Sequence, residues 1–129
     1  MSEVTKLYEN AGIIKQKDCM ADKQAPCHGK CTECSKVFYT YPPFTAEKQL
    51  LLLQLLARIE SADYFQFFFY EIKQEWVFRL NMLTELSCES AYVYESRNKN
   101  FDECIAGLTN LIWQDLTEEQ KQQVKGILE

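Results

Sequence analysis

Glycine and histidine are scarce in this chain of 129 residues, which has four glycines and one histidine. The sequence contains no glycine-rich phosphate loop and no G-x-S-x-G, H-E-x-x-H or kinase motif. A catalytic zinc site usually draws on histidine or carboxylate ligands and keeps one coordination position open. The zinc deaminase signature, H-x-E ahead of P-C-x-x-C, is also missing. We therefore expect a protein that is not an enzyme, with a small hydrolase or redox protein as the weaker alternative.

Long hydrophobic runs are missing as well. The longest aliphatic run is residues 50–53, whereas a helix that spans a bilayer needs about 20 apolar residues. The first residues include Glu3 and form no apolar signal-peptide core. We expect a cytoplasmic protein with no membrane segment. In that compartment, the six cysteines serve as thiols or metal ligands more readily than as disulfides.

The balance of charge is acidic, with a formal net charge of −5. A zinc ion held by four thiolates would make the protein more acidic still. Binding to nucleic acid without sequence preference depends on Lys and Arg that displace counterions from phosphate. We therefore expect no direct contact with nucleic acid. An acidic surface fits better a protein that docks on a basic protein partner.

Residues 13–40 show neither helical nor strand periodicity. A stretch of this length without regular structure is unusual inside a compact domain, so a metal is expected to replace the missing hydrophobic core. Pro42 and Pro43 end this region. We divide the chain into an N-terminal helix with a cysteine-rich zinc module, residues 1–41, and an α+β core, residues 42–129.

Four cysteines within 16 positions predict the metal site: Cys19, Cys27, Cys31 and Cys34. Zinc prefers four ligands in a tetrahedron, and thiolates suit it well. The C-x-x-C spacing of Cys31 and Cys34 lets one tight loop deliver two sulfur atoms to one ion. Gly29 permits the positive φ that the turn between Cys27 and Cys31 often needs. We expect a structural Zn²⁺ with these four cysteines as its ligands.

Other interpretations of the same cysteines stay open. His28 could replace one of the four cysteines as a ligand. Cys31 and Cys34 could form a redox dithiol, although the strand and helix that flank such a motif in thioredoxins are not seen here. A disulfide framework and an iron–sulfur cluster are further possibilities, and the spacing does not separate iron from zinc.

Hydrophobic periodicity predicts two helices in the first half of the chain. Residues 3–11 form one apolar stripe, with Ser2 as a possible N-cap and Gly12 as the terminator. Thr45 caps a second helix through about residue 60. Leucines cover most of its circumference, so we expect a central, buried helix, and a partner could cover one of its faces.

Aromatic and β-branched residues then alternate with a period near two over residues 64–96, which predicts strands with a turn at 73–75. The competing interpretation is one long helix over 64–86. The aromatic run from Tyr64 to Tyr70 could stack on bases, as in RNA-binding sheets. Because that run has no basic residue, we expect its rings to pack in the core.

Two C-terminal helices complete the expected fold. Asn100 with Glu103, and Thr117 with Gln120, have the spacing of capping boxes. The stripes expected to be buried are Ile105, Leu108, Leu111 and Ile112 in the first helix and Val124, Ile127 and Leu128 in the second. Cys88 and Cys104 are expected to be structural thiols. The fold class is α+β: an N-terminal zinc knuckle, a central buried helix, a small antiparallel sheet and two C-terminal helices.

Three stretches resemble small accessory proteins of phages and prophages of Gram-positive bacteria. They are residues 7–12 (LYENAG), residues 41–50 (YPPFTAEKQL) and residues 116–120 (LTEEQ). In that group a cysteine-rich segment commonly separates the first two motifs, as it does here. The resemblance covers about half of the chain.

Some small acidic phage proteins of this kind are anti-CRISPR proteins, which bind the RNA-guided DNA nuclease of type II systems. The resemblance implies a zinc-containing member of that class, acting in the cytoplasm of a bacterial host. It would dock on a basic surface of the nuclease and block the loading of target DNA. The alternative is a zinc-dependent, nucleic-acid-binding regulatory protein of a phage. The sequence leaves open the oligomeric state and the residues that face the partner.

Overall fold

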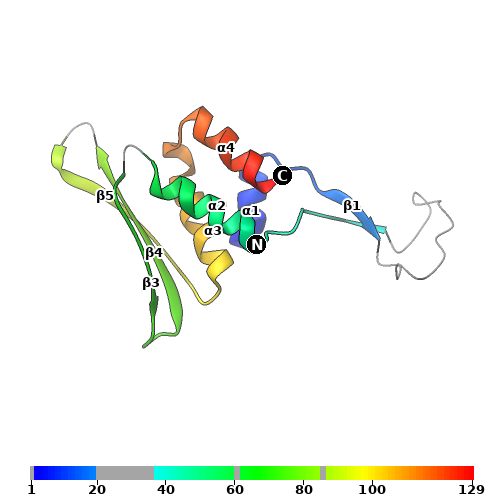
Figure 1. Cartoon of the computed structure of the whole chain (residues 1–129), viewed down its shortest axis with the longest axis horizontal. Coiled ribbons are helices and arrows are strands. Elements are labelled where there is room, and N and C mark those ends of the chain that lie inside the picture. The colour runs from blue at the N-terminus through cyan, green and yellow to red at the C-terminus, as the bar shows by residue number, and fades with distance from the viewer. Residues whose placement is uncertain (1, 20–36, 60–61, 85–86) are drawn as a thin grey trace.

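The computed structural model describes residues 2–19, 37–59, 62–84 and 87–129. Strands β3, β4 and β5 form an antiparallel sheet in that order, and β1 and β2 form a separate ribbon. Helices gather on one side of the sheet, and the ribbon extends from the helices in the direction away from it (Figure 1). The elements in chain order are α1 (Glu3–Asn10), β1 (Gln16–Cys19), β2 (Val37–Thr40), α2 (Ala46–Ala57), β3 (Ala62–Tyr70), β4 (Glu75–Thr84), β5 (Ser87–Asn98), α3 (Phe101–Ile112), the 3-10 helix η1 (Trp113–Asp115) and α4 (Glu118–Leu128).

Side-chain caps start three of the helices, as their sequences predict. The Ser2 hydroxyl accepts a hydrogen bond from the backbone of Thr5 at 3.0 Å, and Thr45 caps α2 in the same way. Thr117 and Gln120 form a complete capping box on α4. Each cap satisfies a backbone N–H that has no partner inside its helix.

The chain leaves α1 through Gly12, whose φ is +73°. Such a left-handed conformation costs a residue with a Cβ atom more than it costs glycine. The backbone N–H groups after α1 bond back to carbonyls of its last turn, including Ile13 to Tyr8 at 3.0 Å. This turn directs the chain out of the helix and into β1.

The predicted strands are confirmed, and the single long helix over 64–86 is wrong. β3 and β4 form a hairpin whose turn covers residues 71–74, and β5 pairs with the other side of β4. The register places Phe67 opposite Phe78 and Phe78 opposite Ser96. Phe78 is fully buried, stacks on Phe67 with ring centroids 5.4 Å apart, and meets Phe101 of α3 edge-on at 5.3 Å.

Helix α3 is the central helix of the core. It packs against α1, α2, β4 and β5, and seven of its twelve residues are buried. Its strip of fully buried side chains includes Ile105, Leu108 and Ile112. Leu111 was expected in the same strip, but it is 51% exposed. A helix covered on two sides still leaves one flank open, and Leu111 lies on that flank.

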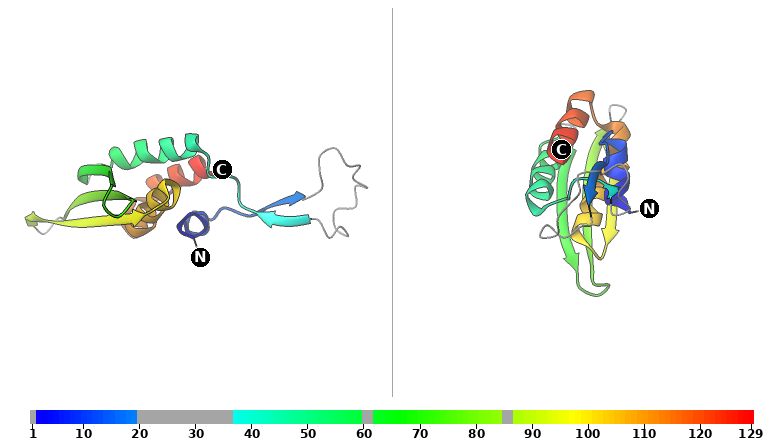
Figure 2. Two further views of the ribbon diagram at one scale, coloured as in Figure 1. Left: turned by 90° about the horizontal axis from the view of Figure 1, so that it is seen from below. Right: turned by 90° about the vertical axis from the view of Figure 1, so that its right-hand side faces the viewer.

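Helix α2 is not the central buried helix that its leucines predict. Only Leu52 and Leu56 of its twelve residues are buried, while Leu50 and Leu51 are 54% and 42% exposed. The helix lies on the outside of the bundle, beside α4 (Figures 1 and 2). An all-round apolar sequence indicates which faces could be covered, but whether a neighbour covers them depends on the tertiary fold.

The capping box expected at the start of α3 is also replaced by another contact. Asn100 stands at the N-cap position without a side-chain cap hydrogen bond. The Glu103 carboxylate instead accepts a hydrogen bond from the backbone N–H of Glu3 at 2.6 Å. Glu103 therefore provides a hydrogen-bond acceptor for a backbone N–H in the first turn of α1. The two residues are 100 positions apart in the chain, so no local pattern could indicate this contact.

The α+β class is confirmed over the residues that the structure describes, with four α-helices and a three-stranded antiparallel sheet. The zinc knuckle lies outside the described residues. Within the described part of the chain, no helix combines the length and the apolar character needed to cross a membrane.

Candidate functional site

The cysteine-rich segment is bracketed by the ribbon of β1 and β2. Their antiparallel pairing sets Cys19 opposite Val37 on the last rung, so the two ends of the intervening segment lie side by side. Cys27, Cys31 and Cys34 fall outside the described residues. Only the backbone of Cys19 among the predicted zinc ligands is therefore placed by the structure, at the entrance to the segment.

The ribbon itself differs from the expectation of an irregular stretch over residues 13–40. Four residues from each side pair as strands. The strand β1 reads QKDC, which has none of the β-branched or aromatic residues that indicate a strand in a sequence. Among the described residues, no group of three His, Cys, Asp or Glu side chains could hold a metal. The zinc prediction thus depends on residues 19–34 themselves, including the alternative with His28.

Aromatic stacking and an apolar contact anchor the base of the ribbon to the core. Ile13, just before β1, is 8% exposed and belongs to the core. Tyr41, just after β2, stacks on Tyr8 of α1 with ring centroids 5.1 Å apart, and the Lys15 ammonium lies 5.3 Å from the Tyr41 ring. Burial raises the pKa of Tyr8, because the phenolate is poorly solvated there. The two ends of the ribbon are thereby held together on α1.

The face of the sheet that points away from the helices carries a second group of candidate side chains, which are aromatic and charged. Phe68 and Tyr70 of β3 lie on this face, with the Arg79 guanidinium 5.3 Å from the Phe68 ring and that of Arg97 5.9 Å from the Tyr70 ring. Val77 between them is fully buried, although it lies outside the main core. The expectation of core packing for the aromatic run thus fits Phe65, but not the side chains on this face.

Both arginines of this face are paired with carboxylates. Glu95 lies 2.6 Å from Arg79 and 3.2 Å from Arg97, and Arg97 also lies 3.3 Å from Glu75. The hydrogen bond from Arg79, and then that from Arg97, holds the pKa of Glu95 below its usual value. The hydrogen bonds from Arg97 to Glu95 and then to Glu75 raise the pKa of Arg97. The sequence did not indicate this network, because Glu75 and Arg79 lie on β4, Glu95 and Arg97 lie on β5, and the two pairs meet only through the register of these strands.

Replacing Glu95 by Gln is expected to destabilise the protein by about 0.5–1 kcal/mol at pH 7, since the pairs are a third exposed and therefore weak. A carboxyl group whose pKa is lowered by folding stabilises the native state above its unfolded pKa. The difference between wild type and Glu95→Gln should therefore disappear as the pH falls through the lowered pKa of Glu95. Urea unfolding at pH 7 and at acidic pH measures it.

Glu118→Gln serves as the control for that prediction. Glu118 is 87% exposed and pairs with Lys121 at 3.5 Å within one helix, so its removal should change the free energy of unfolding by less than about 0.5 kcal/mol. Equal effects of the two substitutions at pH 7 would contradict the special role of Glu95.

A groove of about 590 Å³ runs between α2 and α4. Its apolar lining comes from Leu51, Leu55 and Ile127, and its polar lining consists mainly of glutamines with Arg58. The Lys48 ammonium donates a hydrogen bond to the carbonyl of Leu128 at 2.8 Å, which ties the two helices together. Ile127, expected to point inward, thus lines a surface groove instead.

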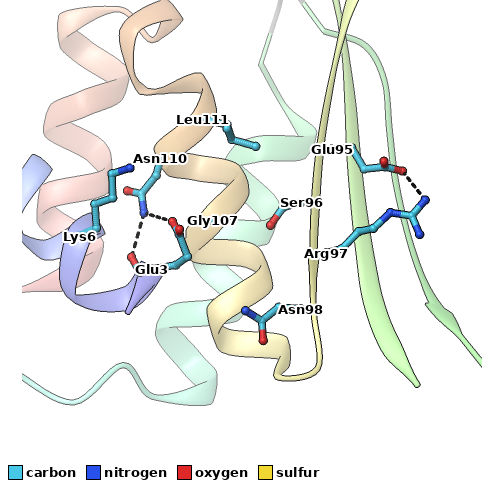
Figure 3. Close-up of a pocket in the computed structure, with 9 residues that line it drawn as sticks. All are labelled: Glu3, Lys6, Glu95, Ser96, Arg97, Asn98, Gly107, Asn110 and Leu111. Carbon is cyan, nitrogen blue, oxygen red and sulfur yellow. Dashed lines mark hydrogen bonds and ion pairs between the residues drawn. The ribbon is translucent and has the colours of Figure 1, made fainter. Parts of the chain in front are cut away.

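A smaller pocket of about 280 Å³ lies between α1, α3 and β5 (Figure 3). The Asn110 side-chain amide donates to the backbone carbonyl and to the carboxylate of Glu3 at 2.9 and 2.8 Å. A Cβ atom at Gly107 would lie 2.7 Å from the Ser96 hydroxyl oxygen. Gly107 therefore permits close approach of α3 to β5, and this pocket is a packing seam whose polar groups largely bond to each other.

Cys104 is a buried structural thiol, as predicted. Its sulfur donates to the backbone carbonyls of Ser96 at 3.1 Å and Trp76 at 3.3 Å, and the Ser96 hydroxyl donates to the carbonyl of Cys104 at 2.8 Å. Burial raises the pKa of this thiol, which disfavours the reactive thiolate. Cys88 lies in β5, and only its backbone is described.

No protein-family model, curated protein or solved structure matches this chain. The structure alone therefore defines its class: a small α+β protein that carries a cysteine-rich segment on a two-stranded ribbon, with a paired-charge face on its sheet and an apolar groove beside α2.

Proposed function

We propose that this protein acts by binding and not by catalysis, and that its partner is the RNA-guided DNA nuclease of a type II CRISPR system. It would dock on a basic surface of the nuclease and block the loading of target DNA, as anti-CRISPR proteins do. The net charge of −5 supports a basic partner, and the phage-like motifs at residues 7–12 and 41–50 support this particular one.

The observation that carries the proposal is the outer face of α2. Leu50 and Leu51 are 54% and 42% exposed, and Leu51 continues into the groove beside α4. Neighbouring large apolar side chains on a helix surface mark interaction sites more often than isolated ones do. A rigid helix that presents leucines beside a groove supplies the apolar anchor that a protein interface needs.

The ribbon would supply a second contact. Its base is fixed to the core by the stacking of Tyr41 on Tyr8 and by the burial of Ile13. Zinc would be bound by thiolates of Cys19, Cys27, Cys31 and Cys34 and would act as a structural cross-link.

The alternative, a nucleic-acid-binding phage regulator, has one feature in its favour. Phe68 and Tyr70 lie beside Arg79 and Arg97 on an open sheet face, and aromatic rings with arginines bind bases in other proteins. Here, however, Glu75 and Glu95 pair with both arginines. Phosphate would have to displace these carboxylates from the arginines. Nucleic-acid binding is therefore a weaker candidate function than binding of a protein partner.

Co-purification with a type II nuclease and its guide RNA tests the proposal. We expect a complex and loss of target cleavage when this protein is added before the DNA, and little loss when it is added after the DNA has been loaded. Affinity should fall with salt, because opposite charges meet. If there is no complex and no loss of cleavage, the proposal is rejected.

A double substitution, Leu50→Asp with Leu51→Asp, tests the α2 face directly. It should weaken the complex by at least about tenfold, because it places charge in an apolar contact. Leu111→Asp is the matched control, since Leu111 is 51% exposed on another helix and the same change there should leave binding intact. Equal effects of both variants would place the interface elsewhere.

A further inference from the structure

Strand β3 is an edge strand with an apolar surface. The sheet order is β3-β4-β5, so within the described residues nothing pairs with the outer side of β3. Phe67 and Phe69 on this strand are 45% and 43% exposed, because the hairpin of β3 and β4 extends beyond the helices (Figures 1 and 2). An exposed edge leaves backbone N–H and C=O groups free to pair with another strand.

Residues 64–70 of this edge lack the usual protection, which β3 has only at its start, in Asp63 and the adjacent bulge. Natural proteins guard long edge strands with lysine, proline, inward-pointing charges or bulges. The stretch from Tyr64 to Tyr70 reads YFQFFFY and contains no charge and no proline, and its pairing with β4 is regular, the bulge lying before Tyr64. An uncharged edge of seven residues with regular pairing to β4 is therefore available.

The sequence of this stretch is almost the same in both directions. A two-fold axis at Phe67 would set Phe67 opposite itself, Phe65 opposite Phe69 and Tyr64 opposite Tyr70 of a second copy. Antiparallel pairing with a two-fold axis is the geometry of an isologous interface, in which the same surface is used by both subunits. Because Phe65, Phe67 and Phe69 alternate along one strand, all six phenylalanines of the pair would lie on one face.

We propose that β3 pairs antiparallel with β3 of a second copy of this chain, about an axis at Phe67, to form a continuous six-stranded sheet in a homodimer. The pairing gives hydrogen-bond partners to the free backbone N–H and C=O groups of β3. It also covers the exposed rings of Phe67 and Phe69. An unrelated extended peptide would have to supply apolar side chains at the same alternate positions, whereas a second copy has them by symmetry.

The charge of the chain sets the salt dependence of this dimer. Each copy carries −5, but the paired stretch is uncharged, so repulsion comes only from the surrounding surface. Salt screens that repulsion, and the dimer should therefore become tighter as salt is added. The proposed nuclease complex should respond in the opposite direction, which separates the two proposals experimentally.

Analytical ultracentrifugation of the full chain over a range of concentrations tests the dimer. We expect a reversible change from 15.2 kDa to twice that mass. Phe67→Glu should raise the dissociation constant by at least about tenfold, because two carboxylates would face each other at the axis. Ile72→Glu is the matched control: Ile72 is 83% exposed in the turn of the same hairpin, and this variant should dimerise like the wild type.

Hydrogen exchange provides a measurement that needs no variant, in case Phe67→Glu fails to fold. Amides of residues 64–70 should exchange more slowly at high than at low protein concentration, while those of the central strand β4 should not change. A mass that stays at 15.2 kDa at all concentrations, or exchange in residues 64–70 that does not depend on concentration, overturns the proposal. If the protein is a monomer and still inhibits the nuclease, the dimer proposal is overturned and the proposed function is not.

Discussion

Removing zinc is expected to disorder the front of this protein and to leave its core folded. Protein purified under reducing conditions should contain one zinc ion per chain. Binding of structural zinc contributes about 10–16 kcal/mol to the folding of small zinc-binding peptides, and residues 19–34 have little apolar surface to replace it. The described core of α1, α3 and the sheet is held by its own apolar contacts, so its melting temperature should change by only a few degrees.

Limited proteolysis measures this effect, because lysines occur at positions 17, 23, 30 and 36. After treatment with a chelator, trypsin should cut at these lysines at least about tenfold faster, since local unfolding controls cleavage. The double substitution Cys31→Ser with Cys34→Ser should reproduce the chelated state without a chelator.

Cys88→Ser is the control for the zinc prediction, because it removes one thiol outside the 19–34 cluster. It should leave the zinc content at one ion per chain. If protein isolated under reducing conditions has no metal and still resists trypsin at the four lysines, the zinc site is refuted. The second contact proposed for the ribbon would then have to be abandoned with it.

Phe78→Ala is expected to destabilise the folded protein by about 3–5 kcal/mol, the usual cost of removing a buried aromatic ring from a core. Phe78 is 0% exposed. Its ring contacts Phe65 and Phe67 on β3 and Phe101 on α3, so the cavity would open where the sheet meets its central helix. Since a domain of this size is stable by about 5–15 kcal/mol, the variant should unfold at markedly lower urea concentration.

Phe68→Ala is the matched control, with the same chemical change on the other face of the same hairpin. Phe68 is partly exposed, and its neighbours are Val77 and the Arg79 guanidinium. Its loss should cost no more than about 1–2 kcal/mol, because little core packing is removed. If the two variants lose equal stability, the helix-covered face of the sheet is not the main core.

Much of the secondary structure followed from local chemistry. The alternation of aromatic residues predicted the hairpin of β3 and β4, and side-chain caps at Ser2, Thr45 and Thr117 predicted where three helices begin. These signals are readable because each depends on residues within a few positions of one another. The buried thiol of Cys104 was predicted for the same reason, since it lies next to the apolar stripe of its own helix.

Apart from the unexpected ribbon of β1 and β2, the predictions that proved wrong concern which surfaces meet. Leu50 and Leu51 of α2 and Leu111 of α3 were expected to be buried, but they lie at the surface. Glu103 bonds to α1 instead of capping its own helix. The hydrophobicity of a side chain indicates that its burial would stabilise the fold. It does not indicate whether another element is there to cover that side chain.

The sequence by itself indicated the helices, the hairpin of β3 and β4, the α+β class and the cysteines that predict a metal site, because these depend on periodicity, capping and spacing along the chain. Only the tertiary structure decided that β1 and β2 pair as a ribbon, that α3 is the central helix, that Arg79 of β4 meets Glu95 of β5, and that β3 is an open edge within the described residues. Such contacts join residues that are distant in the chain, and their existence depends on register and packing, which local sequence does not encode.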